Sequence, residues 1–220
     1  MINNMEEEMQ KKLMKTGTTT VGIVCKDGIV LAADKRTSAG YLIANKNSKK
    51  ISKISDYAAI THAGLVSDAQ LLTRIIKAQI RLEQMRRGKP LYMKEVANLL
   101  GNLLYGNIRR MSMVPGIVGF ILGGKDSKGY ALYDLGIDGS ITEFHDYAST
   151  GSGSVFAFGV LESSYKEGLT VEEGIKLAVK AVNASMQRDM ASGGGVDVLT
   201  ITQKGVEKAL EKIIDSRISA

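Results

Sequence analysis

The junction between Gly17 and Thr18 joins two residue types that could together support peptide-bond chemistry. A threonine hydroxyl is a poor nucleophile unless a base lies beside it, but an N-terminal threonine carries a base in its own α-amino group. The reference pKa of that amine, about 7.7 to 8.0, is close to working pH. Because Gly17 has no Cβ, its carbonyl is open to attack by the Thr18 hydroxyl. The junction therefore suggests self-cleavage, although a plain β-strand of β-branched residues is an open alternative for residues 18–20.

Two charged residues further along the chain could assist such a threonine. Asp34 follows a second apolar run, and a hairpin would bring this run back beside the first, with the carboxylate near Thr18. Lys50 follows the loop of residues 45–49, and an ammonium near the Thr18 amine would lower the pKa of that amine. An Asp34–Lys50 pair would also hold the lysine in place. From charge and spacing alone, a strand-end carboxylate and a solvated loop lysine remain alternatives.

Two clusters of small residues, 149–154 and 189–195, adjoin expected helices. Both clusters are expected to be loops, and their glycines allow the backbone to approach another segment closely. The first cluster is not followed by the Gly-Lys-Ser/Thr of a phosphate-binding P-loop. Taken locally, the first cluster is typical of a helix N-cap and the second of a helix stop.

The elements that would position these residues begin with a hairpin. Residues 19–25 and 29–33 are β-branched and apolar runs, and Asp27-Gly28 between them is a strong signal for a hairpin turn. Turn residues at 124–129 separate two later strands. Besides the hairpin, strands are expected at residues 57–62, 116–123, 130–135 and 196–202.

Four helices are expected from apolar residues that recur every three or four positions. Ser67 and Gln70 resemble a capping box that opens the first helix, which ends at Gly88; Thr170 and Glu173 open the last. The other three helices are expected at residues 93–109, 154–165 and 171–188. The order of strands, two helices, strands, two helices and a strand favours an α+β domain with helices layered on antiparallel sheets. The tail, residues 206–220, is expected to form a short strand or helix.

The composition excludes several other classes of site. Cys25 is the only cysteine, which excludes an internal disulfide, and His62 and His145 alone cannot complete a set of zinc ligands. We therefore expect no metal and no cofactor. The net charge of +6 comes from dispersed basic residues, and the chain has no Trp on which bases could stack. Nucleic-acid binding is therefore not expected.

The start of the chain differs in character from the rest. Residues 1–15 mix Glu and Lys without an apolar stretch, which is unlike a secretory signal. No apolar run approaches the roughly 20 residues that a membrane span needs, so we expect no membrane partner and a cytoplasmic location. Cleavage before Thr18 would remove residues 1–17 as a propeptide and leave residues 18–220 as a single domain.

Six motifs, in order, resemble those of proteasome β subunits, specifically the archaeal type. They are Gly17-Thr18-Thr19-Thr20-Val21-Gly22, Asp34-Lys35-Arg36, Lys49-Lys50, Ala63-Gly64-Leu65-Val66-Ser67-Asp68-Ala69-Gln70, Ala148-Ser149-Thr150-Gly151-Ser152-Gly153-Ser154 and Gln187-Arg188-Asp189-Met190-Ala191-Ser192-Gly193-Gly194. The resemblance covers nearly all of the chain after residue 17. It implies the N-terminal-nucleophile hydrolase fold, a four-layer αββα sandwich of two antiparallel sheets between helical layers.

The resemblance also implies a role for individual residues. It assigns Thr18 as the nucleophile and, through its amine, as the base. Asp34 matches the family's orienting carboxylate, and Lys50 matches the lysine that lowers the pKa of the amine. The residues that match the group around the amine, which shuttles protons, are Ser152, Asp189 and Ser192.

The same family pattern predicts how a substrate would be held. The Gly64 N–H would serve the oxyanion hole. Thr37, His62 and Val66 would line the pocket for the residue that precedes the cut bond. Because His62 would make this pocket partly polar, we expect a preference for apolar or mixed residues, moderated at acid pH if His62 becomes charged.

The function implied by the resemblance is a threonine endopeptidase of the 20S proteasome core, which hydrolyses unfolded proteins. It would work in a barrel of four stacked rings with α subunits and other β subunits, with a regulatory ATPase on the α ring. An alternative is a latent or structural β-ring subunit that supports a second, active β subunit. A third reading is a bacterial-type two-ring threonine peptidase or a small-amide hydrolase of the same fold.

Overall fold

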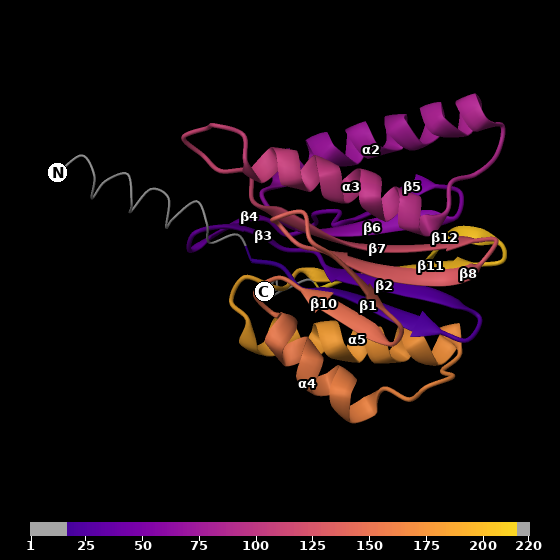
Figure 1. Ribbon diagram of the computed structural model, residues 1–220. Helices are drawn as coiled ribbons and strands as arrows, with labels where there is room; N and C mark the ends of the chain where they lie inside the picture. Colours follow the sequence, from indigo (N-terminus) through magenta and orange to yellow (C-terminus); the bar gives the residue numbers. More distant parts are fainter. Residues whose placement is uncertain (1–16, 215–220) are drawn as a thin grey trace.

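The computed structural model describes residues 17–214, so residues 1–16 of the expected propeptide and residues 215–220 of the tail lie outside the described range. Within this range two antiparallel sheets are stacked face to face, with one pair of helices on each outer side (Figure 1). The four-layer αββα sandwich predicted from the sequence is thereby confirmed.

The first sheet contains the first strand of the described chain. Its strands follow the order β10-β1-β2-β11-β12, with antiparallel pairing throughout. The hairpin of β1 and β2 is confirmed, with Cys25 opposite Gly28 across the turn. The strands are β1 (Thr20–Cys25), β2 (Gly28–Asp34), β10 (Tyr147–Thr150), β11 (Gly195–Thr202) and β12 (Gly205–Ile213).

The second sheet is a meander whose strands follow the order β5-β6-β7-β8-β9. Its strands are β5 (Ile51–Ser55), β6 (Ala58–Gly64), β7 (Val118–Asp126), β8 (Gly129–Leu135) and β9 (Ile141–Phe144). A separate small hairpin, β3 (Thr37–Ala39) with β4 (Leu42–Asn45), follows β2.

Two pairs of helices cover the outer faces of the sheets. In Figure 1, α2 (Val66–Arg87) and α3 (Met93–Ile108) lie over the second sheet, while α4 (Ser154–Ser164) and α5 (Val171–Arg188) lie under the first. Helix α5 begins with the expected capping box, in which Thr170 accepts from the backbone of Glu173. Helix α2 ends at Gly88, which is left-handed (φ +66°) as a helix-ending glycine commonly is.

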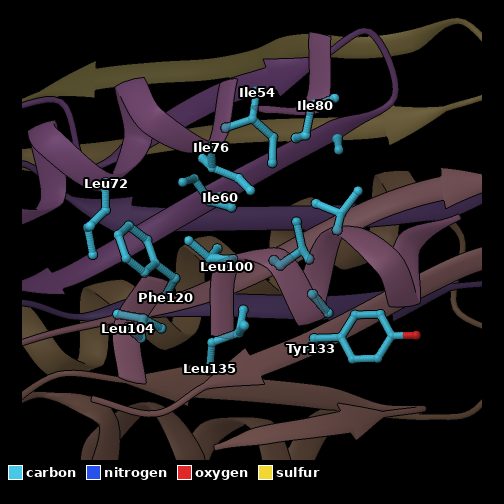
Figure 2. Packing of buried hydrophobic residues seen from close by; sticks show 14 of the residues in the cluster. Ile54, Ile60, Leu72, Ile76, Ile80, Leu100, Leu104, Phe120, Tyr133 and Leu135 are labelled. Carbon is cyan, nitrogen blue, oxygen red and sulfur yellow. The ribbon is translucent and has the colours of Figure 1, made fainter. Parts of the chain in front are cut away.

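Three layers of apolar side chains hold the sandwich together. Strand β2 contributes to two of these layers, because it is buried on both faces. Its Ile29 and Leu31 point between the sheets, whereas Val30 and Ala32 point toward α4 and α5. The third layer lies between the second sheet and helices α2 and α3, where Phe120 packs among aliphatic side chains (Figure 2).

Several local predictions were wrong. The expected capping box of Ser67 and Gln70 does not form, because α2 starts directly from the strand–helix junction at Leu65 without a side-chain cap. Residues 149–150 form the end of β10 rather than a loop, since they pair with β1 at the edge of the sheet. The short strands β3, β4, β5 and β9 were not predicted. The tail, left open as strand or helix, forms strand β12 over Gly205–Ile213.

Candidate active site

Thr18 lies two residues before β1, which begins at Thr20. Its side chain is buried. The Thr18 hydroxyl donates to the Gly17 carbonyl oxygen at 2.7 Å and accepts from Lys50 Nζ at 2.9 Å. The Thr18 carbonyl oxygen accepts from the backbone N–H of Gly153 at 3.3 Å. The hydroxyl is thus held against the carbonyl of the bond that we expect to be cut.

Asp34 ends β2 as a fully buried carboxylate with four donors. Its Oδ1 accepts from Lys50 Nζ at 2.7 Å and from the Thr19 N–H at 2.9 Å. Its Oδ2 accepts from the backbone N–H groups of Arg36 and Gly193, at 3.0 and 2.9 Å. A buried charge is tolerated when it is paired and hydrogen-bonded in this way. Asp34 therefore anchors the lysine and ties three separate backbone segments together.

Lys50 stands at the entrance to β5 with its ammonium between Thr18 and Asp34. Burial lowers the pKa of Lys50, and the neighbouring Asp34 carboxylate opposes that shift. A lysine charge at this position favours a negative charge on Thr18 Oγ1 and disfavours a positive charge on the Thr18 nitrogen. The structure brings together Thr18, Asp34 and Lys50, which are widely spaced in the sequence.

A second polar cluster lies on the other side of the Thr18 backbone. Asp189, the residue that ends α5, accepts at Oδ2 from the hydroxyls of Ser152 and Ser192, each at 2.6 Å. Its Oδ1 accepts from the Ala191 N–H at 3.2 Å. The Ser152 Oγ also accepts from Thr18 N at 3.3 Å. A hydrogen-bonded route therefore runs from Asp189 to the nitrogen that would become the free amine.

Glycines make these approaches possible. Gly151 has φ +97°, and a Cβ there would collide with the Thr18 carbonyl. Gly64, at the end of β6, has φ +124°, and a Cβ there would collide with the Ile117 carbonyl. A side chain at either position would strain the backbone. The role of the Gly64 N–H in an oxyanion hole stays a prediction.

The three residues expected in the substrate pocket come from different elements. Thr37 is in β3 and hydrogen-bonds to the Ser48 hydroxyl, His62 is in β6, and Val66 is the first residue of α2. Burial, with a smaller contribution from the positive charge of Lys50, lowers the pKa of His62 to about 4. His62 is therefore neutral above that pH. Their joint role as a pocket stays a prediction.

A large hollow lies away from this chemistry. It has a volume of about 880 Å³ and opens between the C-terminal half of α2 and the start of α3, where Arg81, Lys89 and Leu91 contribute to its wall. Its lining does not include Thr18, Asp34 or Lys50. Within residues 17–214, no group of three or more His, Cys, Asp and Glu side chains could hold a metal ion.

Sequence reasoning missed two residues that contact the site. Thr19 donates its N–H to Asp34 and shares a hydrogen bond of 2.7 Å with the Ser192 hydroxyl. Ser38 in β3 accepts from the Gly17 N–H at 3.3 Å. Neither had a sequence signal of its own, since Thr19 was read as a strand former and the β3 strand was not predicted.

Comparison with known proteins identifies the family. The model of the family described as "Proteasome subunit" matches residues 14–201. The chain belongs to the proteasome subunit family. The proteasome subunit beta of Archaeoglobus profundus is 42% identical over 97% of both chains. That of Methanothrix thermoacetophila is 45% identical over 91% of this chain and 97% of its own. The proteasome subunit beta 2 of Aeropyrum pernix is 44% identical over 91% of this chain and 89% of its own.

Membership of the proteasome family confirms the resemblance found in the sequence motifs. It also supports the predicted peptidase function in the 20S proteasome core, and it implies assembly with α subunits. The alternative of a latent ring subunit gains no support from these relatives. Within residues 17–214, no helix has the length and apolar character needed to cross a membrane.

Proposed function

We propose that this proteasome-family chain is a threonine endopeptidase that forms by self-cleavage between Gly17 and Thr18. The observation that carries the proposal is the environment of the Thr18 hydroxyl. This hydroxyl contacts the Gly17 carbonyl oxygen and the buried Lys50 ammonium at the same time. The nucleophile is therefore within hydrogen-bond distance both of the carbonyl of the bond to be cut and of a charge that stabilises an alkoxide.

In the proposed self-cleavage, Thr18 Oγ1 attacks the Gly17 carbonyl carbon, and the bond from that carbon to Thr18 N breaks. In net terms the proton that leaves Thr18 Oγ1 ends on Thr18 N, which becomes the leaving amine. Ser152 Oγ lies 3.3 Å from that nitrogen and is bonded to Asp189, so it can relay the proton. Water then hydrolyses the resulting ester. Residues 1–17 leave as a carboxylate, and Thr18 gains a free amine and a free hydroxyl.

The same groups would then cut peptide substrates. The Thr18 amine takes the hydroxyl proton as Oγ1 attacks the substrate carbonyl, and later gives a proton to the leaving amine. Lys50, oriented by Asp34, would keep the pKa of the amine low enough for it to accept that proton. The Gly64 N–H would stabilise the negative oxygen of the intermediate. Water hydrolyses the acyl ester and completes the cycle.

The proposal extends to partners on the basis of the family. The chain would work in a four-ring barrel of α and β subunits in the cytoplasm, and a regulatory ATPase on the α ring would supply unfolded protein. Thr37, His62 and Val66 would line the pocket for the residue before the cut bond. Nucleic acid, a membrane, a metal and a cofactor have no place in this scheme.

The proposal is tested by the intact mass and peptidase activity of the chain assembled with its α partner. Wild type should lose the mass of residues 1–17 and hydrolyse peptides, whereas Thr18→Ala should do neither. Thr142→Ala, in exposed β9, is the matched control and should behave as wild type. Unchanged hydrolysis by Thr18→Ala, with no second β subunit present, would refute the proposal. An uncut, inactive wild-type chain would favour the latent ring subunit instead.

A further inference from the structure

The hydroxyl of Thr19 has no part in the mechanism described so far, yet it is fully buried beside the Asp189 cluster. Its Oγ1 lies 2.7 Å from Ser192 Oγ, a residue 173 positions away in the sequence. The space that it occupies exists because residue 153 is a glycine, since a Cβ there would collide with Thr19 Oγ1. The Thr19 hydroxyl is therefore closely packed against residue 153.

Counting protons gives this hydrogen bond a direction. The single proton of the Ser192 hydroxyl is used at 2.6 Å from Asp189 Oδ2, and a carboxylate can only accept. Ser192 must therefore accept from Thr19, which makes Thr19 the donor. By the same reasoning Ser152 donates to Asp189 and accepts from Thr18 N. Two ordered arms converge on Asp189, one starting at Thr19 and the other at Thr18.

The backbone of Thr19 connects this cluster to the other half of the site. Its N–H donates to Asp34 Oδ1 at 2.9 Å, and its carbonyl accepts from the Asp34 N–H at 3.1 Å. Asp34 in turn holds Lys50. Thr19 is thus bonded to both halves, to the Asp34–Lys50 pair through its backbone and to Ser192 and Asp189 through its side chain.

We infer that Thr19 is a positioning residue for threonine catalysis, whose hydroxyl orients Ser192 and thereby the Asp189 relay to the Thr18 nitrogen. The inference rests on the proposed function. Hydrogen bonds in a chain polarise one another, so loss of the first donor weakens those that follow. Without Thr19, the Ser192 hydroxyl keeps its proton but loses the partner that aims it at Asp189.

The test compares the removal of two buried threonine hydroxyls, of which only that of Thr19 belongs to the Asp189 cluster. Thr19→Val keeps the shape of the side chain and removes the hydroxyl, and Thr19→Ser keeps the hydroxyl and removes the methyl group. Thr20→Val is the matched control, because the Thr20 hydroxyl is equally buried and makes a bond of 2.7 Å to Thr150 Oγ1, outside the Asp189 cluster. Self-cleavage is followed by intact mass, and kcat and KM are measured for a peptide on the processed particle.

Thr19→Val should slow self-cleavage and lower kcat by about five- to thirtyfold, the effect of one well-placed hydrogen bond, with KM within about twofold of wild type. Thr19→Ser should restore most of the rate, and Thr20→Val should stay near wild type. Equal rates for Thr19→Val and Thr20→Val would overturn the inference, because loss of any buried hydroxyl would then explain both. If Thr19→Val does not assemble, Thr19→Ala against Thr20→Ala decides in the same way.

The controls separate this inference from the proposed function. If wild type is active, Thr18→Ala is inactive and Thr19→Val is as active as wild type, only the role of Thr19 is refuted. Activity that does not depend on Thr18 refutes the proposed function, and the role of Thr19 with it.

Discussion

At the scale of single residues, Gly17 is distinguished by the side chain that it lacks. A Cβ at this position would overlap with the Ala191 methyl group and would lie 2.8 Å from Ser152 Oγ. Both neighbours are in the cluster around Asp189. The space beside the bond to be cut therefore fits a glycine and nothing larger, which complements the chemical argument that an unhindered carbonyl is open to attack.

We accordingly expect Gly17→Ala to slow self-cleavage strongly, because the new methyl group must displace Gly17, Ala191 or Ser152 from its place. The measurement is the fraction of processed chain over time by intact mass. Gly106→Ala is the matched control, since residue 106 in α3 has open space where the methyl group would go. Processing of Gly17→Ala at the rate of this control would show that the close fit is not needed.

His62 leads to a prediction about acid stability. Its pKa in the folded chain is lowered to about 4 by burial and by Lys50, against about 6.5 for an ordinary histidine. Between these two values the unfolded chain binds the proton more readily than the folded chain. The stabilisation from a neutral His62 is therefore present near pH 7 and is lost as pH falls from about 6.5 to about 4.

Between pH 7 and pH 5, the free energy of unfolding should fall by about 2 kcal/mol more in wild type than in His62→Gln. Urea unfolding of both chains at the two pH values measures this difference. Equal losses would mean that His62 titrates normally in the folded chain. The same shift revises the expected effect of acid on cleavage preference, which should appear only below about pH 4.

At the scale of secondary-structure elements, an ion-pair cluster around a buried lysine joins the end of β2 to two other strands of the first sheet. Lys35, directly after β2, is fully buried, and its Nζ lies 3.0 Å from Asp197 in β11 and 2.7 Å from Glu211 in β12. The Lys35 N–H also donates to the Gly193 carbonyl at 2.9 Å. The end of β2, which presents Asp34, is thereby attached to the loop that contains Ser192.

Removing the lysine should be costly because it leaves the buried Asp197 carboxylate without a cation. We expect Lys35→Met to destabilise the chain by about 3 to 5 kcal/mol, and Lys35→Met with Asp197→Leu to recover part of the loss. Lys176→Met is the control, since its pair with Glu172 is exposed and should contribute less than about 0.5 kcal/mol. Urea unfolding gives the values, and a Lys35→Met effect as small as that of Lys176→Met would contradict the argument.

At the scale of the whole molecule, the sandwich depends on three apolar layers, and Cys25 reports on one of them. The thiol is buried among β1, β2 and α5, with Gly174 packed against its sulfur. Burial, followed by the charges of Asp27 and Glu173, raises the pKa of Cys25 to about 12. The reactive thiolate is therefore scarce near neutral pH.

We expect iodoacetamide at pH 8 to label Cys25 only as the chain unfolds. Labelling measured by mass across a guanidinium series should follow loss of the circular-dichroism signal. A separate layer that opened by itself would expose the thiol earlier. Labelling well before that transition would therefore show that α4 and α5 leave the sheet independently.

Part of this organisation was predictable because it depends on neighbours in the sequence. The Asp27-Gly28 hairpin, the capping box of Thr170 and Glu173 and the end of α2 at Gly88 are set by turn and cap chemistry within a few residues. The ordered motifs indicated the family before any contact was known. They also named five polar residues that the structure brings around Thr18, namely Asp34, Lys50, Ser152, Asp189 and Ser192.

What the tertiary structure alone decided are the contacts between distant segments. Residues 149–150 became a strand only because β1 offered a free edge, and Ser67 lost its expected capping role because Gly64 and Leu65 lead straight into α2. The bond between Thr19 and Ser192 spans 173 positions, and no local period or propensity encodes such a distance. The sequence by itself therefore determined the elements and the candidate chemistry, whereas the packing of the two sheets decided which hydroxyl faces which carboxylate.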